Sequence, residues 1–218
     1  MGKLSDAIVA LDKAEALAAA RDGLQAGVDP LELVDEARRG LEAVGDKFER
    51  GEYFLMELMR AAQIFQAAAA VLNPAIKQQH GGIPSKGKVL IGTVAGDIHD
   101  LGKNIVKILL ECRGVEVVDL GVDVPADRFL DAMREVNPDV VGLSALLTAS
   151  IPQMRRTIEA IDAGGLRSGA KIIVGGGIVG EVSVVEVHAD HSTTDANEGV
   201  KVIADWISRK GQEAPGRA

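Results

Sequence analysis

The chain has 218 residues, of which 47% are hydrophobic and only 3% aromatic, and its formal net charge is −8. The acidic balance argues against a nucleic-acid partner, because phosphate binding needs clustered lysine and arginine side chains. The single cysteine, Cys112, excludes a disulfide framework and a metal site built from several thiolates. Because aromatic rings are so few, aliphatic side chains must fill the core, which suits helices and parallel strands.

No segment of the sequence predicts an association with membranes. The opening residues lack the apolar core of a signal peptide, and Asp6 stands where a myristoylation signal has serine or threonine. We also find no run of about 20 apolar residues, the length that a membrane span requires. The sequence therefore predicts a cytoplasmic protein with no membrane partner.

Residues 1–80 predict a helical cap domain, a bundle of about four helices. Asp12 and Glu15 have the spacing of a capping box, and Asp29 followed by Pro30 is typical of a second helix start. We expect Pro74 to end the last helix, because proline removes a backbone donor from a helix interior. The predicted helices cover about 4–11, 12–25, 29–50 and 54–72.

A glycine-rich linker over 81–86 separates this cap from a second domain over 87–211, in which apolar strands alternate with helices. Such alternation predicts βαβ units and an α/β Rossmann-like (flavodoxin-like) parallel sheet. Residues 212–218 are expected to form a disordered tail. The predicted strands cover 88–94, 116–119, 140–144, 171–174 and, more weakly, 186–188. The predicted helices cover 104–112, 126–136, 151–163 and 196–210.

The most informative segment is 96–104, Gly-Asp-Ile-His-Asp-Leu-Gly-Lys-Asn, which joins the first of these strands to its helix. A strand-to-helix junction is where an open α/β sheet holds its ligands. It carries His99 with Asp97 two residues earlier, the pattern of an imidazole metal ligand oriented by a carboxylate. Two further segments follow, Ser144-Ala145-Leu146 after 41 intervening residues (103–143) and Gly175-Gly176 after another 28 (147–174).

Asp-x-His-x-x-Gly, Ser-x-Leu and Gly-Gly, in this order and at these distances, resemble the cobalamin-binding domain of methionine synthase. The resemblance is closer to the small corrinoid proteins of methanol, methylamine and related methyltransferase systems, and it extends over roughly 4–205. It implies a cobalamin or related corrinoid whose methylated form is an intermediate. The chain would be a carrier subunit rather than a complete enzyme.

The resemblance also implies roles for single residues. His99 would be the lower axial ligand of cobalt, Asp97 its orienter, and Ser150 the third member of a His–Asp–Ser relay. Phe54 and Met59 would cap the upper face of the corrin ring. The residues expected to bind the cofactor are Gly96, Asp97, Ile98, His99, Asp100, Gly102, Ser144, Leu146, Thr148, Gly175 and Gly176. Residues 189–196 depart from the family pattern, so the far wall of the cofactor-tail pocket is expected to differ.

As partners, the resemblance implies a substrate-specific methyltransferase that loads the methyl group. A second methyltransferase would pass it to tetrahydrofolate or coenzyme M, and a reductive activase would rescue oxidised cobalt. Three alternatives stay open at this point. They are a cobalamin-dependent sensor or regulator, the cobalamin subunit of a mutase, and a flavodoxin-like domain that binds no corrinoid. Cofactor uptake separates the last from the others, and turnover with methyl- or adenosylcobalamin separates carrier from mutase.

Overall fold

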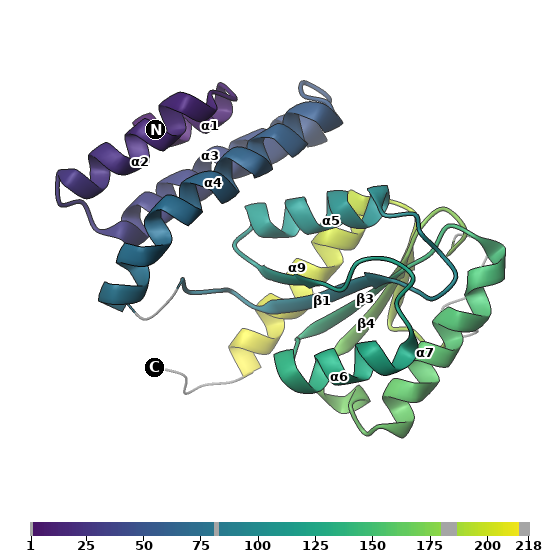
Figure 1. Ribbon diagram of the computed structural model, residues 1–218. Coiled ribbons are helices and arrows are strands. Elements are labelled where there is room, and N and C mark those ends of the chain that lie inside the picture. Colours follow the sequence, from purple (N-terminus) through teal and green to yellow (C-terminus); the bar gives the residue numbers. More distant parts are fainter. Residues whose placement is uncertain (1, 81–82, 180–186, 214–218) are drawn as a thin grey trace. The chain divides into compact units, whose positions relative to one another are not determined.

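The computed structural model describes residues 2–80, 83–179 and 187–213. The chain forms two compact units, one ending at Ser85 and the other beginning at Lys86 (Figure 1). The first unit is built from helices, and the second is an α/β unit with a parallel sheet. The predicted fold class is therefore confirmed.

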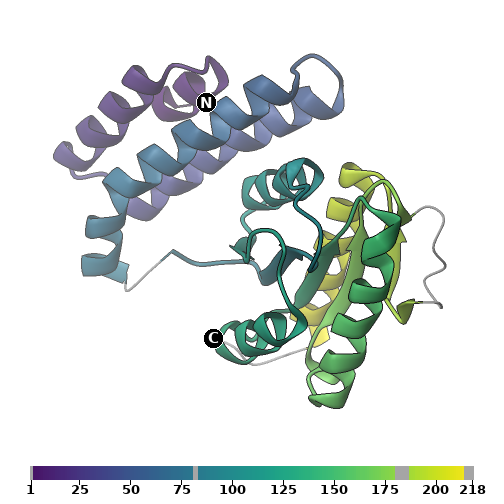
Figure 2. The ribbon, with the colours of Figure 1, turned by 45° about the vertical axis from the view of Figure 1, so that its right-hand side comes forward.

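Four helices make up the described part of the helical unit: α1 (Lys3–Val9), α2 (Lys13–Gln25), α3 (Pro30–Glu49) and α4 (Leu55–His80). α3 and α4 lie lengthwise against each other, α1 packs on α3, and α2 packs on α1 and α4 (Figures 1 and 2). The capped starts of α2 and α3 are confirmed. Each N-cap aspartate accepts a backbone N–H at 2.9 Å, which satisfies a donor that the first turn leaves unpaired.

The prediction that Pro74 ends the last helix is wrong, because α4 continues to His80. A proline inside a helix removes one hydrogen bond and costs about 3 kcal/mol. Leu72 and Ile76, on either side of the proline, are both fully buried. Burial on both sides outweighs the missing bond and holds the helix together.

Of the helices in the described ranges, only α4 is long and apolar enough to cross a membrane by length and composition. The core helix of a soluble bundle passes the same test. Leu58, Ile64 and Leu72 of α4 are fully buried, as a core helix requires. The finding is weak evidence for a membrane span.

The second unit is a five-stranded parallel sheet with the order β2-β1-β3-β4-β5. β1 and β3 are neighbours, so the chain reverses its direction of winding between them, and this is the point where such sheets bind ligands. The strands are β1 (Lys88–Thr93), β2 (Glu116–Asp119), β3 (Val140–Ser144), β4 (Lys171–Gly175) and β5 (His191–Thr193).

Helices cover both faces of the sheet, with α6 and α7 packed together on one face and α5 and α9 on the other (Figures 1 and 2). Two short 3-10 turns, η1 (Thr148–Ser150) and η2 (Arg167–Gly169), flank α7. The four helices are α5 (Leu101–Cys112), α6 (Ala126–Val136), α7 (Ile151–Ala163) and α9 (Ala196–Glu213).

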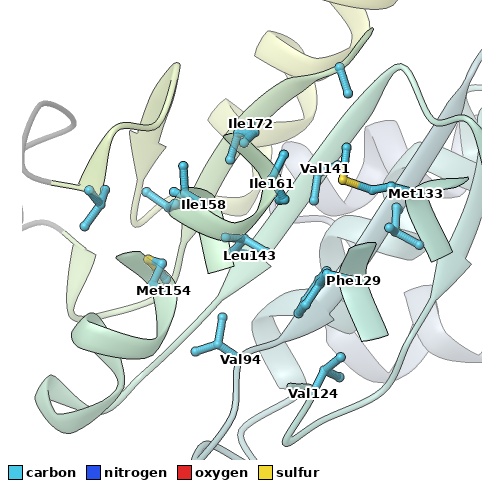
Figure 3. Close-up of a cluster of buried hydrophobic side chains, with 14 of the residues drawn as sticks. Val94, Val124, Phe129, Met133, Val141, Leu143, Met154, Ile158, Ile161 and Ile172 are labelled. Atoms are coloured by element: carbon cyan, nitrogen blue, oxygen red, sulfur yellow. The ribbon is translucent and has the colours of Figure 1, made fainter. Parts of the chain in front are cut away.

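The hydrophobic core of this unit lies between the sheet and the α6–α7 layer (Figure 3). Phe129 of α6 and Ile158 of α7 pack with Leu143 of β3, and all three side chains are almost completely buried. Gly92 in β1 makes room for the Phe129 ring, because a Cβ there would lie 2.8 Å from the ring edge. The core fixes β1 and β3, whose ends carry the motifs.

Two predictions about the end of the chain need correction. The fifth strand is His191–Thr193; Glu186 lies outside the described residues, and His188 sits in a turn with φ +63°. The N–H of Asp190 donates to the Ile172 carbonyl at 2.8 Å, and Asp190 Oδ2 accepts the N–H of Ile172 at 2.7 Å. These bonds fix the chain beside β4, and the strand begins at the next residue. α9 runs to Glu213, so 212 and 213 are helical, and 214–218 lie outside the described residues.

Candidate functional site

The carboxyl ends of the strands gather three loops at one edge of the sheet. The loop after β1 carries His99, the loop after β3 carries Leu146, and the loop after β4 carries Gly176. β3 lies between β1 and β4, so the three sequence motifs meet although they are far apart in the chain. The parallel topology that the sequence predicts thus builds the site.

His99 and Asp97 form a close pair at the centre of this edge. His99 Nδ1 lies 2.7 Å from Asp97 Oδ1, and the backbone N–H of His99 donates to the same oxygen at 3.0 Å. The Asp97 side chain is fully buried, whereas the imidazole is 47% exposed. A carboxylate on Nδ1 favours the tautomer with its proton there, which leaves the Nε2 lone pair for a metal.

The second oxygen of Asp97 reaches across to the β3 loop. Oδ2 accepts the backbone N–H groups of Leu146 at 2.7 Å and of Leu147 at 3.1 Å. Burial raises the pKa of Asp97, but the hydrogen bonds from His99, Leu146 and Leu147 outweigh it and lower the pKa to about 2. Asp97 is therefore an anion at neutral pH.

The relay predicted through Ser150 stays a prediction. Ser150 is buried at the end of η1, but no hydrogen bond joins it to Asp97 in the part of the chain that the structure describes. The amides of Leu146 and Leu147 both donate to Asp97 Oδ2. A backbone donor leaves no mark in the sequence, so side-chain patterns could not reveal it.

A cavity of about 530 Å³ opens beside His99, between the sheet and helices α5 and α9. Six glycines contribute to its wall, from β3, β4, the loop after β4, α5 and α9: Gly102, Gly142, Gly175, Gly176, Gly177 and Gly199. Gly176 has φ +124°, and a Cβ there would collide with the carbonyl oxygen of Ala145. The cavity exists because side chains are missing from its wall.

The structure brings most of the predicted cofactor-binding residues to this cavity. The predicted residues that line it are Ile98, His99, Asp100, Gly102, Ser144, Leu146, Gly175 and Gly176. Asp97 supports His99 from behind, and Gly96 donates its N–H to Asp123 Oδ1 at 2.7 Å. Thr148, in η1, is exposed and does not line the cavity. A second, wide-open hollow at the start of α2 in the helical unit contains none of the predicted residues.

Exposed apolar side chains surround His99. Ile98 is 73% exposed and Leu101 is 57% exposed, both in the His99 loop or directly after it. Leu146 and Leu147 are 46% and 41% exposed, although their backbone amides bind Asp97. Such a concentration of exposed apolar groups marks a surface that a ligand or partner covers.

Sequence reasoning missed several supporting residues. Thr93, at the end of β1, donates its hydroxyl to the carbonyl oxygen of His99 at 3.0 Å. Lys103, in the cavity wall, forms a buried ion pair with Asp119 at the end of β2, with Nζ 2.7 Å from each carboxylate oxygen. Lys103 directly follows the predicted motif, but the sequence does not indicate its partner on another strand.

In the helical unit, the start of α4 exposes two large apolar side chains. Phe54 is 70% exposed and Met56 is 73% exposed, whereas Met59 is partly buried within the bundle. Sequence reasoning chose Phe54 and Met59 for the cap. In the structure, Met56 is more accessible than Met59.

Comparisons with known proteins identify the family of this chain. A B12 binding domain model matches residues 87–201, and a second B12 binding domain model matches residues 2–73. The chain is 37% identical over 205 residues to trimethylamine corrinoid protein 2 of Methanosarcina acetivorans, covering 92% of this chain and 94% of the relative.

Two solved structures are also similar. A cobalamin-binding protein from Desulfitobacterium hafniense aligns with a TM-score of 0.68 and 38% identity, covering 93% of this chain and 96% of that one. The methanol:cobalamin methyltransferase complex of Methanosarcina barkeri contains a chain that aligns with a TM-score of 0.87 and 26% identity, covering 94% of this chain and 78% of that one. On these grounds the chain belongs to the B12-binding corrinoid proteins of methylamine and methanol methyltransferase systems.

Proposed function

We propose that this protein binds a corrinoid with His99 Nε2 as an axial ligand of cobalt, and that it carries a methyl group between two methyltransferases. The observation that supports this most directly is the placement of His99. Its Nδ1 is bonded to a buried carboxylate, and its exposed ring stands among apolar side chains beside a cavity. A large flat cofactor with one free axial position suits this arrangement.

The cavity fits the nucleotide tail of such a cofactor. Its walls consist largely of glycine and aliphatic residues, which can lie flat against an aromatic base. Ser144, at the end of β3, lines the cavity, and its hydroxyl has no hydrogen-bond partner among the described residues. We assign to Ser144 a hydrogen bond with a buried polar group of the tail.

Bound cobalt would supply the centre that accepts a methyl group and passes it on. The contribution of the chain is to hold and release His99. Asp97 keeps the proton on Nδ1 and directs Nε2 outward.

The partners follow from the relatives. One relative is named for trimethylamine, and one solved structure is a complex with a methanol:cobalamin methyltransferase. We propose a substrate-specific methyltransferase as donor and a second methyltransferase, acting on tetrahydrofolate or coenzyme M, as acceptor. A reductive activase would restore oxidised cobalt, and all of these partners would be cytoplasmic.

Phe54 and Met56, with Met59 behind them, are proposed to shield the reactive face of the bound cofactor. Phe54→Ala is then expected to speed air oxidation of the reduced, cobalamin-loaded protein severalfold, because water and oxygen gain access. Absorbance at fixed oxygen concentration measures the rate. Val28→Ala is the control, since Val28 is also an exposed apolar residue of the helical unit. Equal rates in the two variants would contradict the shielding role of Phe54.

Cofactor uptake tests the proposed function. After mixing with hydroxocobalamin and desalting, the wild-type protein is expected to retain a corrin absorption spectrum. Gly175→Leu is expected to abolish retention, because residue 175 lies on the same face of β4 as the cavity-lining Ile173. Gly169→Leu is the matched control, since a side chain at Gly169 meets open space. A folded wild-type protein that stays colourless with several lower bases would contradict the proposal.

A further inference from the structure

Thr93 is a buried residue that the proposed function does not yet use. It ends β1, it is completely buried, and its Oγ1 donates to the carbonyl oxygen of His99 at 3.0 Å. We propose that Thr93 is a positioning residue that sets how strongly His99 binds cobalt. This inference rests on the proposed function, in which His99 is the axial ligand.

The hydrogen bond from Thr93 fixes the backbone carbonyl of His99, which Asp97 does not contact. Asp97 Oδ1 accepts the N–H of His99 at 3.0 Å, and Thr93 binds its carbonyl group. Both backbone polar groups of His99 are thus held by side chains, and Nδ1 is held as well. The imidazole can then move mainly by rotation of its own side-chain bonds, which limits the positions that Nε2 can reach.

The bond also decides where α5 begins. The first hydrogen bond that enters this helix runs from the N–H of Asn104 to the carbonyl of Asp100, at 2.8 Å. If the helix began one residue earlier, the carbonyl of His99 would accept the N–H of Lys103. Among the described residues, the carbonyl of His99 accepts the Thr93 hydroxyl and no N–H from Lys103. The bond from Thr93 therefore favours His99 on the loop, outside the helix.

Thr93 is itself held rigidly in place. Its N–H donates to Gly121 at 3.0 Å, its carbonyl accepts the N–H of Val124 at 2.9 Å, and its backbone pairs with Ser144 of β3. A β-branched side chain has few rotamers. The backbone of His99 is thus anchored to the β-sheet through Thr93.

Thr157 offers a matched control within the same unit. It is 2% exposed, and its Oγ1 donates to the carbonyl of Gln153 at 2.9 Å within α7. Thr157→Val and Thr93→Val therefore each remove one buried hydroxyl–carbonyl bond from a threonine and leave a side chain of the same shape. Only Thr93 contacts the His99 loop, so a general loss of stability affects both variants and a loss of ligand positioning affects one.

The test uses the full chain loaded with cob(II)alamin and electron paramagnetic resonance. One coordinated 14N ligand splits each cobalt line into three, and a coordinated 15N ligand splits it into two. Labelling the protein with 15N-histidine therefore distinguishes His99 from the benzimidazole of the cofactor and gives the fraction of protein with His99 bound. Thr93→Val is expected to lower the equilibrium constant for His99 binding about tenfold, because the carbonyl of His99 loses its donor. Thr93→Ser keeps the hydroxyl and should restore most of the wild-type value, and Thr157→Val should leave the splitting unchanged. Wild-type splitting in Thr93→Val would overturn the proposal.

Hydrogen exchange of the cofactor-free protein separates this inference from the proposed function. Without its bond from Thr93, the segment 97–104 should exchange its amide protons faster in Thr93→Val than in Thr157→Val at equal global stability. If the wild-type protein binds cobalamin without nitrogen splitting, the ligand role of His99 fails and the inference fails with it. If splitting is present and exchange of 97–104 is the same in both variants, Thr93 does not position the loop.

Discussion

His99→Ala is expected to keep its corrinoid and lose the axial nitrogen. His99 is one of many residues that line the cavity that we assign to the cofactor tail, so retention after desalting should be close to wild type. The threefold splitting of the cobalt(II) resonance should disappear. Methyl-transfer turnover should fall at least about 100-fold, because loss of even a supporting residue at a metal site costs 10–100-fold.

His80→Ala provides the control for this experiment. His80 Nε2 lies 2.8 Å from Asp29 Oδ1 in the helical unit, so it is a histidine–aspartate pair of similar geometry. It is expected to leave both the resonance and the turnover unchanged. If His99→Ala kept the nitrogen splitting, another residue or the benzimidazole of the cofactor would be the ligand. If it lost the splitting but kept wild-type turnover, the ligation would have no role in transfer.

Lys103→Met is expected to lower the free energy of unfolding by about 3–5 kcal/mol, the cost of breaking a buried ion pair from one side. The Lys103 side chain is 2% exposed, and Asp119 is 17% exposed. In the variant, Lys107, with Nζ 3.6 Å from Asp119 Oδ2, is the one cation left beside this carboxylate among the described residues. Urea unfolding at pH 7 measures the loss.

The pH dependence of this difference checks its origin. Burial raises the pKa of Asp119, but the hydrogen bond and charge of Lys103, together with the Gly121 amide and Lys107, outweigh burial and lower it. A lowered carboxylate pKa means stability that is present above the unfolded value of about 3.9 and is lost as pH falls through the folded pKa. The difference in the free energy of unfolding between wild type and Lys103→Met should therefore become smaller in acid.

Lys88→Met is the surface control for the ion pair. Lys88 and Glu116 lie 4.0 Å apart with both side chains about half exposed, and such pairs contribute at most about 1 kcal/mol. If Lys103→Met lowered the free energy of unfolding no more than Lys88→Met does, the buried pair would contribute little to stability. A gap that widened in acid would contradict the assigned role of Asp119.

The sequence predicted the elements whose cause is local or periodic. The N-caps at Asp12 and Asp29 and the bounds of β2, β3, α6 and α7 agree with the structure, because capping chemistry and apolar period act within a few residues. The motif around His99 also indicated the site, since the carboxyl ends of parallel strands converge.

The errors share a different cause, because each depends on contacts between distant segments. Pro74 lies inside α4 owing to burial on both sides of it, and β5 starts only after Asp190 has docked on β4. The partners of Asp97 on the β3 loop are backbone amides, which every residue possesses. Gly142 and Gly199 line the cavity without belonging to a recognisable motif.

The carboxylate of Asp97 is a mechanical bridge as well as an acceptor. One of its oxygens is fixed to His99 and the other to the two amides that lead into η1. Thr148 and Ala149, at the exposed side of η1, are open to contact from outside. A protein that bound to this turn and displaced it would move the amides of Leu146 and Leu147. Through their hydrogen bonds, this would move the Asp97 carboxylate and the His99 imidazole. Contact at η1 would thus act on the position of His99 from a distance, through Asp97.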